Sequence, residues 1–350
     1  MSCLTVLCPG EQLSVRCAGA LDAALCGQTV RRVTCLSPDA PLENCRILFV
    51  LSLPESGVNP AVYELLALLR TTPGFLEGST AGILVDGAGT LHTKAVAREL
   101  VLAANGAGCA FVGRPLVEAA GALQNFTVQA RNAHCDLEQA YHLAAADLAV
   151  RVLAFTPPKK KRPQILVLHA SNHKTSNTLA MWSAVRRRLE ADCDISEIGL
   201  RNGTLEDCSG CPYTMCLHYG ERGDCFYGGV MVREVYPAIR EADGVVVLCP
   251  NYNDALSANL TACINRLTAL YRTTDFSGKA LFALVVSGYS GGDIVAAQLV
   301  SALNMNKGFW LPPHFCLLET ANDAGAAMAL PGIEATLAQF GENVLCQLKQ

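Results

Sequence analysis

Long hydrophobic runs are absent from this 350-residue sequence. The longest ones, such as residues 280–286, fall far short of the roughly 18 apolar residues that a membrane helix needs. The N-terminal apolar stretch has no basic segment before it, so it resembles a first strand more than a signal peptide. The formal charge is −4, which gives no basic excess that would favour nucleic acid or an anionic membrane. We expect a cytoplasmic protein with no nucleic-acid partner and no membrane partner.

The commonest nucleotide-binding fingerprints are absent as well, since the chain has neither a G-x-G-x-x-G nor a Walker A sequence. A disulfide framework is also unexpected. The 17 cysteines are an odd number, and most stand singly in apolar segments, as Cys8, Cys35, Cys249, Cys263 and Cys316 do. Such thiols act as small apolar side chains, which suits a reducing cytoplasm.

What the chain does contain is an alternation of strand and helix patterns. Its first half has helical patterns at 60–70, 93–104 and 135–153 among five strand candidates. These strands are Leu4–Cys8, Val30–Leu36, Arg46–Leu53, Thr80–Asp86 and Cys109–Gly113. Alternating strands and helices predict a parallel sheet with helices on both faces.

Residues 156–163 contain three prolines and four consecutive cations, which is typical of a linker; a nuclear-localisation patch is the alternative. We therefore predict a first domain at 1–155, a linker at 156–163 and a second domain at 164–350. The second half repeats the alternation, and residues 82–111 run parallel to residues 283–310. Its predicted strands are Ile165–His169, Ile195–Leu200, Gly244–Cys249, Leu281–Val286 and Phe309–Pro312.

A loop rich in hydroxyl and amide side chains follows the buried strand at 165–169 and leads into a helical pattern at 179–190. Strand, hydroxyl-rich loop and helix N-terminus form a geometry that holds phosphate, because free backbone N–H groups and the helix dipole both favour an anion. An ordinary strand-to-helix turn capped by Asn177 or Ser176 explains the same residues.

Two more loops come directly after strands of the second half, at the sheet edge where open α/β sheets bind ligands. One is Pro250-Asn251-Tyr252-Asn253, followed by the helix start at 254–258, and the other is the glycine-rich segment 287–292. The three loops supply a phosphate cradle, an aromatic side chain and close backbone approach. A flat, phosphorylated heteroaromatic cofactor requires these features, although the tyrosines could also serve packing alone.

With these loops, residues 164–316 resemble the flavodoxin-like, NAD(P)H-dependent FMN reductases, including the iron–sulfur flavoproteins. The resemblance implies an α/β fold of two flavodoxin-like doubly wound parallel-sheet domains in tandem. It also implies that FMN phosphate is held by Ser171, His173, Thr175, Ser176, Asn177 and Thr178. By the same resemblance the isoalloxazine is lined by Pro250, Asn251, Tyr252 and Asn253, and closed on its other side by Ser287, Gly288 and Tyr289. No catalytic acid or base is implied, because the flavin performs the hydride transfer.

Four cysteines, Cys208, Cys211, Cys216 and Cys225, lie within one loop of the second half. The iron–sulfur flavoproteins carry a compact cysteine motif at this place, and four thiolates suit a [4Fe–4S] cluster or a structural zinc. Here the gaps after the first pair are wider than in the usual motif, so free thiols that pack the loop are the third alternative.

The leading hypothesis is an FMN-dependent oxidoreductase that passes electrons from NAD(P)H, or from an electron-transfer protein, to an unidentified acceptor. The alternative is a non-catalytic flavodoxin-fold redox sensor or scaffold with a metal at the cysteines. A homo-oligomer agrees with the family, whose members commonly pair.

We predict that the first domain is a degenerate flavodoxin-like domain without a flavin site. The loop after its first strand carries Glu11 and no hydroxyl, so it would repel a phosphate, and the loop at 53–57 has no aromatic side chain. Such a domain could act as a built-in partner for the second one. It could also be independent and bind another ligand.

Overall fold

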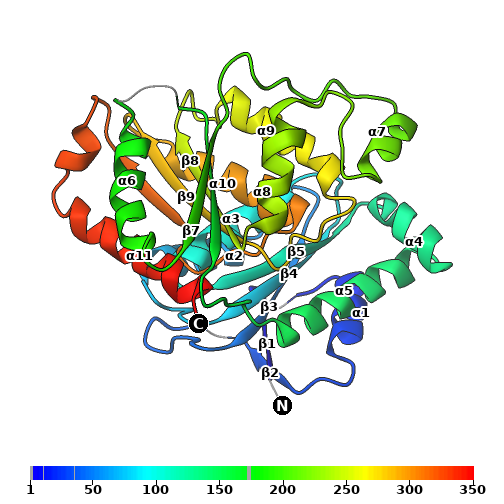
Figure 1. The fold of residues 1–350 in the computed structure, drawn as a ribbon. Coiled ribbons are helices and arrows are strands. Elements are labelled where there is room, and N and C mark those ends of the chain that lie inside the picture. The colour runs from blue at the N-terminus through cyan, green and yellow to red at the C-terminus, as the bar shows by residue number, and fades with distance from the viewer. Residues whose placement is uncertain (1–2, 11, 35, 172–174) are drawn as a thin grey trace. The chain divides into compact units, whose positions relative to one another are not determined.

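The structure is a computed structural model, and it describes residues 3–10, 12–34, 36–171 and 175–350. The chain divides into two compact units, Met1–Thr156 and Pro157–Gln350. Each unit contains one five-stranded parallel sheet with helices packed against it (Figure 1).

In the first unit the strands are β1 (Leu4–Leu7), β2 (Val30–Val33), β3 (Arg46–Leu53), β4 (Thr80–Gly87) and β5 (Ala110–Ala120). The helices are α1 (Val15–Leu25), α2 (Pro60–Thr71), α3 (Thr93–Gly106), α4 (Thr127–Ala133) and α5 (Leu137–Ala154), with a 3-10 turn η1 (Gln124–Phe126). The sheet order is β2-β1-β3-β4-β5.

In the second unit the strands are β6 (Gln164–His169), β7 (Asp194–Gly199), β8 (Gly244–Pro250), β9 (Ala280–Ser287) and β10 (Cys316–Thr320). The α-helices are α6 (Asn177–Leu189), α7 (Tyr213–Gly220), α8 (Tyr236–Glu241), α9 (Ala258–Leu270), α10 (Gly292–Leu299) and α11 (Ile333–Leu348). Two π-helical segments, η2 (Met231–Val235) and η3 (Val300–Lys307), and a 3-10 turn, η4 (Ala326–Ala329), complete the unit.

The second sheet has the order β10-β9-β8-β6-β7, which repeats the first order when its strands are numbered within the unit. This order, 2-1-3-4-5, is that of the flavodoxin-like doubly wound fold. The predicted fold class is therefore confirmed for both halves. In this fold ligands bind at the carboxyl ends of the strands.

The strands inside each sheet are buried on both faces because their sequences are nearly continuous apolar runs, whereas the edge strands β2, β7 and β10 are partly exposed. Every residue of β4 and of β9 is buried. In the first unit α1 packs against α5, and in the second α6 packs against α11, where Figure 1 shows the two helices side by side. Gly82 in β4 permits the close approach of α5, because a Cβ there would lie 2.8 Å from Leu148 Cδ1.

One predicted strand is wrong. Residues 309–312 form only an isolated bridge, between Trp310 and Ala280, and the edge strand of the sheet is β10, Cys316–Thr320. The sequence continues with Pro312-Pro313, and prolines have no N–H to donate to a ladder, so the segment cannot extend as a strand. The sequence pattern also does not predict α7 inside the cysteine loop or the π-helical segments.

The predicted linker is attached to the second unit. The Lys160 N–H donates to the carbonyl of Leu348 at 2.8 Å, and Arg162 Nε lies 2.7 Å from Asp194 Oδ1.

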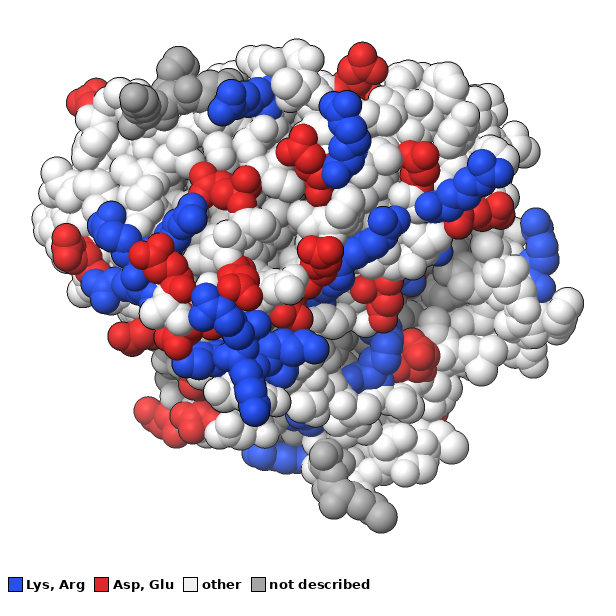
Figure 2. Space-filling view, in the orientation of Figure 1, with Lys and Arg blue, Asp and Glu red and all other residues white. Residues whose placement is uncertain are grey.

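On the face shown in Figure 2, Lys and Arg side chains gather in one dense group that acidic side chains surround. Among the described residues, no helix is long and apolar enough to cross a membrane.

Candidate functional site

The hydroxyl-rich loop after β6 leads directly into α6, as its sequence predicts. Ser176 is the N-cap of α6: its Oγ accepts from the N–H of Leu179 at 3.4 Å and lies 2.9 Å from Thr178 Oγ1. Ser171 and Thr175 flank the loop, while His173 lies outside the described residues. Hydroxyls and the N-terminus of a 13-residue helix therefore lie together, which is a donor set for an anion.

Asn177 does not face the loop interior but joins it to the far edge of the sheet. Its Nδ2 donates to the carbonyl of Asp323 at 2.9 Å and to that of Ala321 at 3.3 Å, and its Oδ1 accepts from the N–H of Ala327. The segment 321–323 follows β10 and also bonds to the third loop, since the Ala321 N–H donates to the Ser287 carbonyl at 2.8 Å. The sequence pattern does not indicate this fourth loop, because it predicts the last strand at 309–312 and the strand lies at Cys316–Thr320.

The loop after β8 is a tight hairpin built by its own residues. Tyr252 and Ala255 exchange backbone hydrogen bonds, and the two residues between them, Asn253 and Asp254, have φ values of 55° and 56°. A two-residue turn of this kind needs positive φ at both positions, and Asn and Asp tolerate it well. The turn leaves the ring of Tyr252 57% exposed.

Asn251 fastens the second loop to the third. Its Nδ2 lies 3.1 Å from Ser287 Oγ, 2.9 Å from the Ser290 carbonyl and 3.1 Å from Asp254 Oδ1. The backbone of Gly291 approaches so closely that a Cβ there would lie 1.9 Å from Asp254 Oδ1. The two loops therefore form one packed platform.

The residues present fit a phosphorylated flat ring. Within the described ranges Asn251 Oδ1 is buried and has no hydrogen-bond partner, so one acceptor of the platform is left for a ligand donor. Tyr252 and Tyr289 present exposed rings, with Tyr289 82% exposed, while hydroxyls and a helix N-terminus stand at the other loop. The exposed tyrosine rings suit the flat ring of such a molecule, and the hydroxyls with the N-terminus of α6 suit its phosphate.

His169 ends β6 just before the hydroxyl-rich loop, and its side chain is buried. Its Nε2 lies 3.4 Å from Glu197 Oε1 on β7, and Glu197 also accepts from Trp182 Nε1 and Arg186 Nη1 of α6. Burial lowers the pKa of His169, and the carboxylate of Glu197 opposes that shift. This network ties the base of the loop to α6 and β7.

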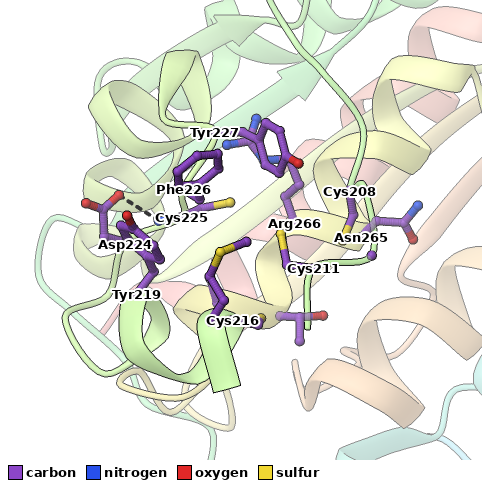
Figure 3. Close-up of a pocket in the computed structure, with 14 residues that line it drawn as sticks. Cys208, Cys211, Cys216, Tyr219, Asp224, Cys225, Phe226, Tyr227, Asn265 and Arg266 are labelled. Atoms are coloured by element: carbon purple, nitrogen blue, oxygen red, sulfur yellow. Dashed lines mark hydrogen bonds between the residues drawn. The ribbon is translucent and has the colours of Figure 1, made fainter. Parts of the chain in front are cut away.

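The four clustered cysteines line one pocket of about 90 Å³ between the loop at 206–228 and helix α9 (Figure 3). All sixteen cysteines among the described residues are free thiols. Within the described ranges, no three His, Cys, Asp or Glu side chains are grouped so that they could hold a metal ion. The structure thus brings the four thiols to one pocket without forming a coordination site.

The sequence analysis does not single out one residue of this pocket, Arg266. Arg266 is only 3% exposed and lies on the apolar face of α9 between Cys263 and Leu267. Burial raises the pKa of the Cys263 thiol to about 12, and Arg266 opposes the shift. A charged residue at an apolar helical position was the available sequence signal, because arginine is rarely fully buried without a partner.

The equivalent edge of the first unit is arranged differently. Arg16, in the first turn of α1, pairs with Asp86 at the end of β4 through Nε–Oδ2 at 2.8 Å and Nη2–Oδ1 at 3.0 Å. Ser14 caps α1 by accepting from the N–H of Cys17 at 3.0 Å. Glu11, on which the predicted repulsion of phosphate rested, lies outside the described residues.

Strand order defines the second unit as a doubly wound α/β domain, and its connected loops lie at the carboxyl edge of the sheet, where this fold binds ligands. Residues 163–323 match the family model of the NADPH-dependent FMN reductases. The resemblance found in the sequence over residues 164–316 is therefore confirmed.

The chain is similar to an iron–sulfur flavoprotein of Archaeoglobus fulgidus, with 25% identity over 150 residues that cover 41% of this chain and 72% of the relative. Among solved structures it is similar to an apo NADH:FMN oxidoreductase, with 16% identity, 54% of this chain and 91% of that chain covered, and a TM-score of 0.36. An NAD(P)H:quinone oxidoreductase from Methanothermobacter marburgensis gives 16% identity, 52% and 97% coverage and a TM-score of 0.41. The family match supports a flavin oxidoreductase in general terms and specifies neither electron donor nor acceptor.

Proposed function

We propose that the second unit binds FMN at the carboxyl edge of its sheet and passes electrons from NAD(P)H, or from an electron-transfer protein, to an acceptor. The observation that carries this proposal is the set of hydrogen bonds that connects the loops within the segment that matches the FMN reductase family. Asn251 joins the second loop to the third, and Asn177 joins the hydroxyl-rich loop to residues 321–323, where the Ala321 N–H donates to the Ser287 carbonyl. These loops are far apart in the sequence, yet hydrogen bonds connect them at one edge of the sheet.

The hydroxyl-rich loop would hold the phosphate. Ser176 and Thr178 place hydroxyls at the first turn of α6, where backbone N–H groups and the helix dipole add to the attraction for an anion. Ser171, His173 and Thr175 complete the proposed phosphate contacts. Asn177 would contribute through its backbone N–H, because its side chain bonds to the segment after β10.

The platform made by the second and third loops would hold the ring. Pro250, Asn251, Tyr252 and Asn253 form one wall, and Ser287, Gly288 and Tyr289 form the other. Bound FMN would supply the hydride chemistry, while these residues orient the ring and exclude water from it. No side chain is required to move a proton.

Titration of the purified full chain with FMN tests the proposal. Wild-type protein should quench FMN fluorescence at one equivalent per chain, since the first unit is proposed to have no flavin site. The Ser176→Ala and Thr178→Ala double variant should bind at least about tenfold more weakly, because two donors to an anion are lost. Ser183→Ala is the matched control, since its Oγ donates to the Leu179 carbonyl within α6 and lies away from the loop.

Electron transfer is tested by mixing the FMN-loaded protein with NADH or NADPH without oxygen and following the flavin band at its absorption maximum. Bleaching by either nucleotide supports the oxidoreductase. Flavin that binds but is reduced by neither nucleotide would point to an electron-transfer protein as donor or to the non-catalytic alternative. A protein that never binds FMN contradicts the whole proposal.

For the cysteine loop we propose a [4Fe–4S] cluster at Cys208, Cys211, Cys216 and Cys225, on the strength of the four thiols in one pocket and the similarity to an iron–sulfur flavoprotein. As placed, the thiols are not a coordination site, so a cluster would require the loop to draw inward. Anaerobic analysis should find about four iron and four sulfide per chain. Zinc at one per chain would favour the structural-metal alternative, and no metal would leave four free thiols.

A further inference from the structure

The edge of the sheet proposed to bind the flavin has few positive charges. The described residues of the loops after β6, β8, β9 and β10 include no Lys or Arg, and Asp254 and Asp323 add negative charge there. Arg201, in the loop after β7, is exposed, and within the described ranges no carboxylate lies within ion-pair distance of its side chain. A phosphate monoester carries about two negative charges near neutral pH. Among the described residues of these loops, Arg201 is the cation that can balance them.

The backbone around Arg201 is held on both sides. The Leu200 N–H donates to the His169 carbonyl at 2.7 Å, which joins the end of β7 to the end of β6. Asn259, in the first turn of α9, donates through Nδ2 to the Leu200 carbonyl at 2.7 Å. The Arg201 carbonyl accepts from the N–H and the Oγ1 of Thr204 at 3.2 and 2.8 Å. A fixed backbone beneath an exposed cation reduces the ordering that a ligand must impose, which favours binding.

The Arg201 side chain folds back toward the base of the hydroxyl-rich loop. A Cβ built on Gly199 would lie 4.0 Å from Arg201 Nε and 3.3 Å from His169 Cε1, so the two side chains share one face of the sheet. Helix α6 covers that face, since Trp182 Nε1 donates to Glu197 Oε2 at 3.2 Å, two residues before Gly199. Because α6 follows β6 through the hydroxyl-rich loop, its N-terminus lies at the carboxyl edge, where Arg201 also lies.

The guanidinium is level with the first turn of α6. From the contact between Trp182 and Glu197, Ser176 lies about 9 Å nearer the carboxyl edge, at a rise of about 1.5 Å per residue of helix. Gly199 lies about 7 Å nearer that edge, at about 3.3 Å per residue of strand. Because Arg201 folds over Gly199, its charge is at the height of the Ser176 hydroxyl and of the free N–H groups of α6.

From these observations we infer that Arg201 is the charged contact for the phosphate of FMN and makes the site selective for FMN over riboflavin. The described phosphate contacts proposed above are hydroxyls and backbone N–H groups, which are neutral, so Arg201 supplies the charge that they lack. Arginine suits this role because its planar guanidinium can donate two parallel hydrogen bonds to one phosphate. The inference rests on the proposed flavin function and adds to it a residue from the loop after β7.

Fluorescence titration of the full chain with FMN and with riboflavin tests the inference. Riboflavin has the same ring and no phosphate, so it reports on the ring platform alone. Arg201→Gln should raise the Kd for FMN about tenfold and leave the Kd for riboflavin unchanged, because only the phosphate contact is lost. Arg201→Lys should give an FMN Kd between those of wild type and Arg201→Gln, since the charge remains but the paired donors do not.

Two controls separate a phosphate contact from a general effect of charge. Arg187→Gln removes the same charge from the exposed last turn of α6, about 14 Å along the helix from Thr178, and should bind both flavins as wild type does. Added salt should weaken FMN binding more steeply for wild type than for Arg201→Gln, because salt screens the attraction between the guanidinium and the phosphate.

The inference is overturned, while the proposed function stands, if wild type binds FMN and Arg201→Gln binds it equally well. In that case, a loss of activity with NADPH but not with NADH would assign Arg201 to the phosphate of the nucleotide. The inference is also overturned if Arg201→Gln weakens FMN and riboflavin to the same extent, since the residue then acts on the ring platform or the fold. Wild type that binds neither flavin overturns the proposed function and this inference together.

Discussion

Removing the Asn251 side chain should separate the two loops that form the proposed ring platform. Its Nδ2 lies within 3.1 Å of three acceptors, on the second and third loops. An amide nitrogen has only two protons, so about two full hydrogen bonds are made at a time. Asn251→Ala therefore removes two bonds and leaves three acceptors without their donor.

At about 0.5–1.5 kcal/mol for each bond, the loss is about 1–3 kcal/mol. Water can reach the Ser290 carbonyl and the exposed turn, so we expect the lower half of that range. If the platform must be formed to bind the ring, this cost appears in the affinity, and about 1.4 kcal/mol corresponds to a tenfold rise in the FMN Kd.

Fluorescence titration with FMN and urea unfolding followed by circular dichroism measure the two effects on the same sample. Asn132→Ala, at an exposed position of α4 in the first unit, is the control and should change neither. An Asn251→Ala protein that unfolds at lower urea but binds FMN as tightly as wild type would refute the link between the loop platform and the ring. An unchanged stability would refute the hydrogen-bond argument itself.

Three further predictions concern the scaffold. Burial lowers the pKa of His169, so below its unfolded value of roughly 6.5 the unfolded chain binds more protons than the folded one; stability should fall as pH falls through that value, and His169→Gln should flatten this part of the urea–pH profile. Asp86→Asn leaves Arg16 without its charged partner and should cost about 3 kcal/mol, at the low end for a buried pair because Arg16 is partly exposed, as measured by urea unfolding. Gly82→Ala should destabilise the fold by about 1–3 kcal/mol through overpacking against α5 and so lower the melting temperature, whereas Gly106→Ala, which meets no atom within 4 Å, should not lower it.

Much of the fold follows from apolar runs and their spacing. Strands β3, β4, β6, β8 and β9 are nearly continuous apolar segments, and each was located within a residue or two of its observed bounds. The strand at 309–312 was misplaced because Phe-Trp-Leu resembles a strand in composition. What excludes it is the proline pair that follows, and the less apolar Cys316–Thr320 takes the edge position instead.

The sequence predicts the loops of the candidate site but not the side-chain hydrogen bonds that connect them. Composition shows hydroxyls, a tyrosine and glycines after successive strands, and the fold brings those ends together. That Asn251 and Asn177 fasten the loops to one another depends on side-chain directions that no sequence pattern specifies. The hydrogen bonds of Arg266 could not be predicted for the same reason, since its partners are backbone carbonyls 38 and 60 positions away.

The two units share one fold but carry different side chains at two equivalent positions. Arg16 and Thr178 are each the second residue of the helix that follows the first strand, after the caps Ser14 and Ser176. Asp86 and Ser287 correspond when residues 82–111 are matched to residues 283–310.

In the first unit these two positions hold a guanidinium and a carboxylate, which satisfy each other at 2.8 Å. In the second unit they hold hydroxyls: Thr178 lies 2.9 Å from the cap Ser176, and Ser287 accepts from Asn251. A helix N-terminus attracts negative charge. In the first unit the carboxylate of the Arg16–Asp86 ion pair supplies that charge at the edge of the sheet, whereas in the second unit the hydroxyls carry no charge, so a ligand anion would supply it. The first unit therefore keeps the fold without needing a bound anion, and this supports the proposal that FMN is held by the second unit alone.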